Sequence, residues 1–154
     1  MLQNEIVDIL LRAGIPANTK GFTYIHDALE LMDKDSYYFS GKVCVLYAKI
    51  AKQNGATPGQ VERAIRYAFE GALTRGDLES VEHYLDPINT RNSNELKVLF
   101  LRWKQETRQT EKFSYDTISA YRAQIYNEIL DEMNALTSKL RQAASNVPSQ
   151  KMAM

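Results

Sequence analysis

Apolar residues recur at spacings of three and four along most of the chain, which is the period of an amphipathic helix. Ile6, Ile9, Leu10 and Ala13 follow this spacing and mark a first helix that ends at Gly14. No run of alternating β-branched residues competes with the helical period. The pattern therefore predicts an all-α fold.

Similar stripes, bounded by Gly, Pro and capping residues, predict the helices that follow. Thr57 is a natural N-cap, and Pro58 after it suits the first position of a helix because its missing N–H is not needed there. Residues 33–40 mix polar and aromatic types and predict a loop or a broken helix. The predicted helices cover about residues 20–33, 43–53, 58–75, 78–85 and 92–105.

The C-terminal third of the sequence has a different organisation. The polar run ETRQTEKF predicts a hinge over 107–113 between a helix-turn-helix domain of about six helices, residues 1–106, and a long amphipathic helix over 114–144. Residues 145–154 are predicted to be a disordered tail. The stripe of the long helix is closer to a 3.6-residue than to a 3.5-residue period, so it does not predict a long coiled coil. Two alternatives stay open: the helix packs across its own domain, or it mediates dimerisation or docks a partner. The stripe consists of Ile118, Tyr121, Ile125, Ile129, Met133, Leu136 and Leu140.

The segment around residues 42–71 has the pattern of a helix-turn-helix. This motif needs a small residue where its helices cross, a glycine in the turn and an apolar residue that packs back onto the first helix. Ala51, Gly55 and Val61 supply these three features at spacings of four and six. The second helix is then a candidate recognition helix for the major groove of DNA.

Five polar side chains of this segment have suitable chemistry for double-stranded DNA. Arg63 can offer a bidentate fork to guanine, Glu62 can accept from cytosine and Gln60 can pair with adenine. Arg66, one turn further along, and Lys52, near the end of the first helix, suit phosphate. The alternative is that Glu62 and Arg66, four residues apart, form an ordinary surface ion pair.

Charge is unevenly distributed along the sequence. The whole chain has 19 basic and 19 acidic residues and no net charge, so its composition does not indicate a polyanionic partner. From Lys42 to Arg75, however, six basic residues face only two acidic ones, which gives +4 and leaves −4 for the remainder. A basic segment on an acidic body is typical of a phosphate-binding surface.

Other kinds of chemistry find little support. The single cysteine, Cys44, excludes an intramolecular disulfide and a cysteine cluster for zinc. Neither His26 nor His83 has a Cys or Ser at a spacing that suggests a catalytic dyad. No phosphate loop or dinucleotide fingerprint is present, so we expect no enzyme, no cofactor and no metal. The N-terminus has no signal peptide and no apolar run reaches membrane-spanning length, so we expect a cytoplasmic protein with no membrane partner.

Three motifs are similar to those of a known family. The runs IPANTKGFTYI, VLYAKIAK and VERAIRYA, followed by TRGD, resemble the C-terminal effector domain of the sporulation master response regulator, stage-zero sporulation protein A. That family has VPAHIKGYLYL, VLYPDIAK and VERAIRHA, followed by SRGN, in the same order and spacing. The resemblance covers residues 5–106. It implies an all-helical domain whose helix-turn-helix binds promoter DNA, with a homodimer forming on the site.

The match also indicates individual site residues. Glu62, Arg63 and Arg66 match recognition-helix positions, which implies base and phosphate contacts. Thr57 and Lys52 match as well, and the resemblance makes them candidates for contacts with the DNA backbone.

Several positions depart from the family. Gly59 and Gln60 replace a Ser-Arg pair, Asn18 replaces a His and Cys44 replaces a Lys. Each change removes a phosphate or base contact, so we expect altered specificity and weaker affinity. Only four residues precede the resemblance, so we also expect no receiver domain and no control by aspartyl phosphorylation.

The resemblance further implies a contact with the sigma factor of RNA polymerase through the region after TRGD. Ser80 fits that stretch, whereas residues 86–89 do not. Two alternatives to a transcriptional regulator remain: an interaction module that keeps the fold but binds DNA weakly, and a DNA-binding protein for plasmid or phage maintenance.

Overall fold

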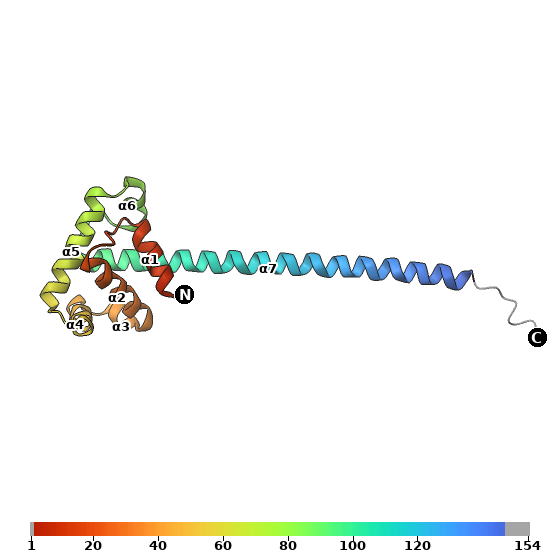
Figure 1. Cartoon of the computed structure of the whole chain (residues 1–154), viewed down its shortest axis with the longest axis horizontal. Coiled ribbons are helices and arrows are strands. Elements are labelled where there is room, and N and C mark those ends of the chain that lie inside the picture. The colour runs from red at the N-terminus through yellow and green to blue at the C-terminus, as the bar shows by residue number, and fades with distance from the viewer. Residues whose placement is uncertain (1, 147–154) are drawn as a thin grey trace, which may run out of the picture. The chain divides into compact units, whose positions relative to one another are not determined.

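The computed structural model describes residues 2–146, all of whose regular elements are helices (Figure 1). The predicted all-α fold is confirmed. The short α3 shows that residues 33–40 are a broken helix rather than an open loop. The helices are α1 (Leu2–Arg12), α2 (Lys20–Lys34), α3 (Ser36–Ser40), α4 (Val43–Asn54), α5 (Pro58–Arg75), α6 (Leu78–Tyr84) and α7 (Asn92–Ser145).

The helix boundaries follow from local capping chemistry. The Thr19 hydroxyl accepts a hydrogen bond from the Phe22 backbone N–H at 3.3 Å and starts α2. The Asp77 carboxylate does the same for the Ser80 N–H at 3.3 Å and starts α6. After α1 the chain turns at Gly14, whose φ of 81° lies in the left-handed region that favours glycine.

The chain consists of two compact units, and the boundary between them lies between Thr107 and Arg108. The division lies close to the predicted domain boundary, but the structure has α7 running through 107–113, where the sequence predicted a hinge. The polar run there has no apolar stripe that could face a core. It also has no Gly or Pro, and several of its residues favour helix, so it keeps its helical propensity. Of the predicted tail, Ser145 ends α7 and residues 147–154 lie outside the described range.

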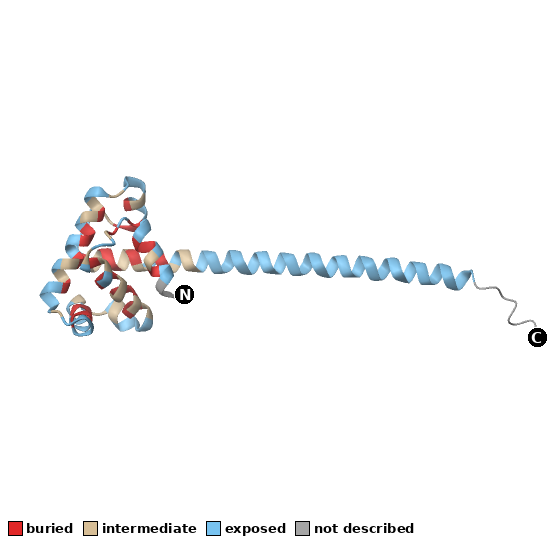
Figure 2. Cartoon of the chain, viewed as in Figure 1, coloured by how far each residue is buried: buried red, intermediate tan, exposed pale blue. Residues whose placement is uncertain are grey.

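The core of the first unit is built where α5 crosses α2 (Figure 2). Gly21 makes a close approach possible: a Cβ at this position would lie 2.6 Å from the Ala68 Cβ and would also press on the Ala64 carbonyl oxygen. Phe69 of α5 and Ile25 of α2 are both buried at this crossing. This crossing fixes the position and orientation of α5 in the first unit.

The first turns of α7 complete the same core. Leu96, Leu99 and Trp103 are almost fully buried. Lys104 forms an ion pair with Asp33 of α2 at 2.6 Å. This part of α7 therefore belongs to the helix-turn-helix domain.

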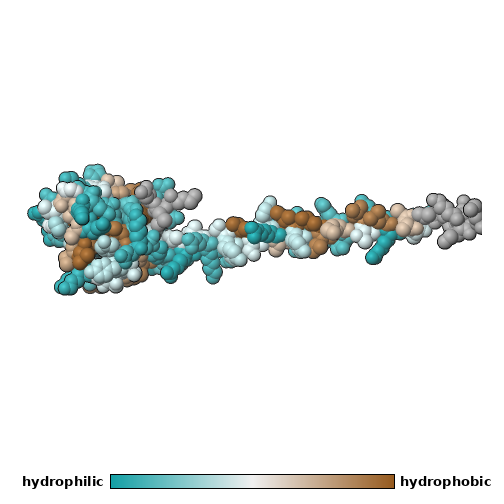
Figure 3. Space-filling model, turned by 90° about the horizontal axis from the view of Figure 1, so that it is seen from below, coloured by the Kyte–Doolittle hydropathy of each residue, from teal (hydrophilic) through white to brown (hydrophobic). Residues whose placement is uncertain are grey.

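The second unit consists of the remainder of α7, whose described side chains are all exposed. Apolar residues gather along this helix in the space-filling view (Figure 3). No helix within residues 2–146 is long and apolar enough to cross a membrane.

Candidate nucleic-acid interface

The helix-turn-helix consists of α4, a short turn and α5. Gly55 ends α4 in the left-handed conformation, with φ of 63°, and a Cβ there would meet no atom within 4 Å. Ala56 N–H donates to the Ala51 carbonyl oxygen at 3.0 Å, which closes the turn. Ala51 and Val61 are buried, as the helix-turn-helix pattern requires, and the predicted glycine turn at Gly55 is confirmed.

A capping box holds the start of α5. The Thr57 hydroxyl accepts from the Gln60 backbone N–H at 3.2 Å, and the Gln60 side-chain oxygen accepts from the Thr57 backbone N–H at 3.0 Å. The predicted N-cap at Thr57 is confirmed, and the T-x-x-Q spacing accounts for the second role, that of Gln60, which was not predicted. An adenine contact by Gln60 would require this side chain to leave the box.

The two arginines of α5 lie on its exposed side. Arg63 Nε donates to the Gly59 carbonyl oxygen at 3.3 Å, which leaves its terminal nitrogens at the surface. Arg66 pairs with Glu62 at 3.1 Å, and its guanidinium carbon lies 5.9 Å from the centre of the Tyr67 ring. The ordinary i, i+4 ion pair considered from the sequence is therefore formed. Base contact by Glu62 competes with it.

Lys52 lies in the last turn of α4, is exposed and precedes the turn that leads to α5. Five of the six predicted contact residues are exposed, and Glu62 is half-buried. The motif thus brings all six to two consecutive helices and the turn between them.

Asn92, the first residue of α7, ties the recognition helix to the rest of the domain. Its side-chain amide donates to the Glu62 carbonyl oxygen at 3.0 Å, and its side chain is also hydrogen-bonded to Tyr47 of α4. Burial raises the pKa of the Tyr47 hydroxyl above its ordinary value, and the bond to Asn92 partly opposes this. The sequence pattern predicts only that Asn92 stands at the start of a helix. No local pattern could reveal a partner 30 residues away.

One turn later, Glu95 is an ionisable residue with no exposed surface. One carboxylate oxygen accepts from the Asp86 backbone N–H at 2.8 Å, while Oε1 is buried without a hydrogen-bond partner. Burial raises the pKa of Glu95 to about 7, with the Asp86 N–H opposing the shift. The sequence analysis missed this residue, although Glu95 stands directly beside Leu96 in an apolar stripe.

The loop before α7 is closed by Asp86. Its Oδ1 accepts from the Ile88 and Asn89 backbone N–H groups at 2.9 and 3.1 Å, and Oδ2 accepts from the Asn94 amide at 3.0 Å. These donors, Asn89 foremost, lower the pKa of the carboxyl. The departure from the family at residues 86–89 thus has a structural role of its own.

The histidines take part in polar clusters away from α5. His26 Nδ1 lies 3.7 Å from the Asp27 carboxylate and 3.9 Å from that of Glu30. These three side chains are spaced so that they could hold a metal ion. The Asp27 carboxylate, however, accepts a hydrogen bond from the Asn54 amide, and the Glu30 carboxylate accepts one from the Lys34 ammonium. His83 Nε2 lies 3.3 Å from Glu106. Neither arrangement supplies a nucleophile.

Together these features define the class: a helical domain with a helix-turn-helix whose second helix is capped, anchored and arginine-bearing on its exposed side. The chain belongs to the family described as the C-terminal domain of the sporulation initiation factor Spo0A, whose model matches residues 6–107. This confirms the resemblance drawn from the sequence motifs. The family is a DNA-binding domain of a sporulation transcription regulator and is not a known enzyme family.

Proposed function

We propose that this protein is a sequence-specific transcriptional regulator that binds double-stranded DNA through α5 and acts as a homodimer. The observation that carries the proposal is the exposed first half of α5, where Arg63 and Arg66 follow a complete capping box in a domain of this family. Such a helix enters the major groove with its N-terminal residues against base edges.

The contacts divide by chemistry. Arg63 contacts a guanine through the guanidinium nitrogens that its bond to Gly59 leaves at the surface. Lys52 and the Thr57 hydroxyl contact the sugar-phosphate backbone, and Arg66 contacts phosphate when it releases Glu62. Glu62 and Gln60 contribute base contacts only after leaving their present partners.

Selection of bound sequences from a random duplex pool tests the proposal, followed by a salt titration with the selected site. We expect an enriched motif and an affinity that falls steeply with salt. Equal binding to all pool sequences would overturn sequence specificity. No binding at low salt would instead favour the interaction module, the alternative that the loss of the family's Ser-Arg pair at Gly59 and Gln60 supports.

Dimerisation is proposed through the second unit. From Ile118 to Leu140 the apolar stripe makes six intervals in 22 residues, or about 3.67 residues per interval, and all its members are exposed. An isolated helix that exposes such a stripe is marginal in water and needs a covering partner. Residues 108–146 contain five basic and five acidic residues, so two copies have no net charge to oppose their association.

The mass of the full chain in solution, by sedimentation equilibrium, tests this step. We expect a dimer, and we expect Ile129→Asp to yield monomers because it places a charge within the stripe. Ala120→Asp is the matched control, since residue 120 lies on the opposite side of the same helix by its spacing from Ile118. A monomeric parent chain, or Ile129→Asp that remains dimeric, would overturn the proposed interface.

Contact with the sigma factor is proposed through α6. Ser80 lies in its first turn, but the Ser80 hydroxyl is bonded to Asp77 at 3.2 Å. The contact would therefore involve the helix surface around Ser80 more than the hydroxyl itself. A two-hybrid assay against the sigma factor, with Glu79→Arg on the exposed side of α6, tests it; signal that is unchanged by this variant would overturn the placement.

A further inference from the structure

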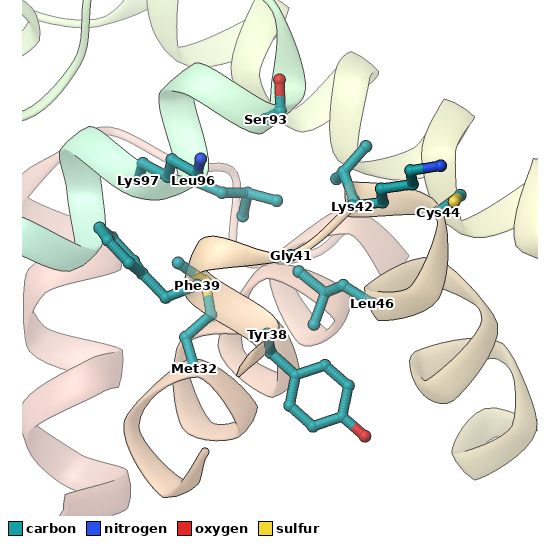
Figure 4. Close-up of a pocket in the computed structure, with 11 residues that line it drawn as sticks. Met32, Tyr38, Phe39, Gly41, Lys42, Cys44, Leu46, Ser93, Leu96 and Lys97 are labelled. Carbon is teal, nitrogen blue, oxygen red and sulfur yellow. The ribbon is translucent and has the colours of Figure 1, made fainter. Parts of the chain in front are cut away.

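A pocket of about 380 Å³ opens in the first unit, and none of the residues that line it belongs to α5 (Figure 4). It is formed by residues of α2, α3, the start of α4 and the start of α7, and none of the six predicted DNA contacts lines it. Its volume falls in the range of pockets that hold small molecules. Lys42 and Cys44 on its wall are exposed, so the pocket is open to solvent rather than a packing gap inside the core.

The pocket lining combines an apolar wall with a small number of polar side chains. Met32, Leu46 and Leu96 are buried core residues and form apolar wall, together with the partly buried Phe39 ring. The polar lining residues are two lysines, two hydroxyl-bearing residues and a cysteine, and no Asp or Glu is among the described lining residues. They are Lys42, Lys97, Ser93, Tyr38 and Cys44, and Figure 4 draws the two lysine nitrogens at opposite sides of the pocket.

The Lys97 side chain is held at the pocket by a contact with an aromatic ring. Its Nζ lies 5.7 Å from the centre of the Phe39 ring, a cation–π distance, so the ammonium lies against the apolar wall. We propose that this pocket binds a small organic anion with an apolar body, whose head group pairs with Lys97 and whose body contacts Phe39, Leu46 and Leu96. An apolar wall beside a lysine, with no acidic residue among the described lining residues, favours this class over neutral or cationic ligands.

The pocket is also linked to the recognition helix. Its walls include the first turns of α4 and α7, and the Tyr47–Asn92–Glu62 chain of hydrogen bonds joins these two helices to α5. A ligand bound between α4 and α7 therefore changes the position of α5, and this changes the affinity for DNA. This second part rests on the proposed function, whereas binding of the anion does not.

Cys44, the only cysteine of the chain, gives a readout confined to the pocket. The test measures the rate at which iodoacetamide alkylates Cys44 in the full chain while 8-anilinonaphthalene-1-sulfonate is titrated. N-phenyl-1-naphthylamine, which has the same aromatic body without the sulfonate, is titrated in parallel. We expect the sulfonate probe to slow alkylation severalfold and saturably, and the neutral probe to need about tenfold more for half-protection, as expected for loss of one charge-assisted interaction.

Variants locate the interaction. Lys97→Gln should raise the half-protecting concentration of the sulfonate probe about tenfold, while Lys20→Gln, the same change on an exposed residue outside the lining, should leave it unaltered. Binding of the probe to the exposed stripe of the second unit would not protect Cys44. Unchanged alkylation, equal protection by both probes, or Lys97→Gln that behaves as the parent would each overturn the site.

DNA affinity is then measured with and without saturating sulfonate probe. A severalfold change supports the link to α5, and an unchanged affinity overturns the link alone. A chain that shows Cys44 protection but no DNA binding would contradict the proposed function and leave the anion site standing.

Discussion

Replacing the buried carboxyl of Glu95 should stabilise the protein, and only at neutral and alkaline pH. The pKa of Glu95 rises from an ordinary 4.5 to about 7 in the folded protein because the group is buried. Between these values the folded state binds a proton that the unfolded state has lost. Stability is therefore fully present below pH 4.5 and falls as the pH rises toward 7.

The size of the effect follows from the shift. Each tenfold change in an ionisation equilibrium is worth about 1.4 kcal/mol, so the difference between 4.5 and about 7 corresponds to about 3.5 kcal/mol at most. Gln at residue 95 resembles the protonated acid and can still accept from the Asp86 N–H. We expect Glu95→Gln to be about 2–3 kcal/mol more stable than the parent at pH 8, and to be within about 1 kcal/mol of it at pH 5.

Urea unfolding at several pH values measures this difference. Trp103 is the only tryptophan and is 2% exposed, so its fluorescence reports on the first unit. Glu82→Gln, the same change on an exposed glutamate, is the control and should show no such pH dependence. If the stability difference between Glu95→Gln and the parent were the same at pH 5 and pH 8, the burial argument would be refuted.

Four further substitutions test DNA contacts and packing. Arg63→Ala should relax base preference at one position of the selected site by about 1–3 kcal/mol, whereas Lys52→Ala should weaken all sequences equally and lower the salt slope by about 1; binding curves on single-base variants of the site distinguish them. Gly21→Ala should lower the free energy of unfolding by about 2–3 kcal/mol in urea titrations because its Cβ would force α2 and α5 apart. Gly59→Ala should instead raise it by about 0.5–1 kcal/mol, since a Cβ at Gly59 meets no atom within 4 Å.

Features with a short-range physical cause were predictable from the sequence. The helical period, the Thr57 cap and the Ala51, Gly55 and Val61 pattern depend on neighbours a few residues away, and the structure confirms each of them. The six proposed DNA contacts remain predictions.

Features that depend on tertiary packing were not predictable in the same way. The bond from Asn92 to the Glu62 carbonyl oxygen and the pocket between α4 and α7 join segments far apart in the sequence. The continuous α7 over 107–113 differs from the predicted hinge for another reason: this run lacks an apolar stripe but also lacks Gly and Pro, the residues that oppose a helix most strongly.

The start of α5 shows how a substitution can exchange function for structure. Where the family has an arginine, Gln60 supplies the second half of a capping box, a bond worth about 0.5–1 kcal/mol to the helix. The Gln60 side-chain oxygen is engaged with the Thr57 N–H, so a two-point contact with adenine requires Gln60 to leave the capping box, and the first turn of α5 is made rigid at the expense of that contact. Base preference then depends on Arg63, the first arginine of α5, which is exposed. This exchange predicts that fewer base contacts form than with the family's Ser-Arg pair. The affinity for DNA should therefore depend more on phosphate contacts, such as that of Lys52, and on the association of two copies.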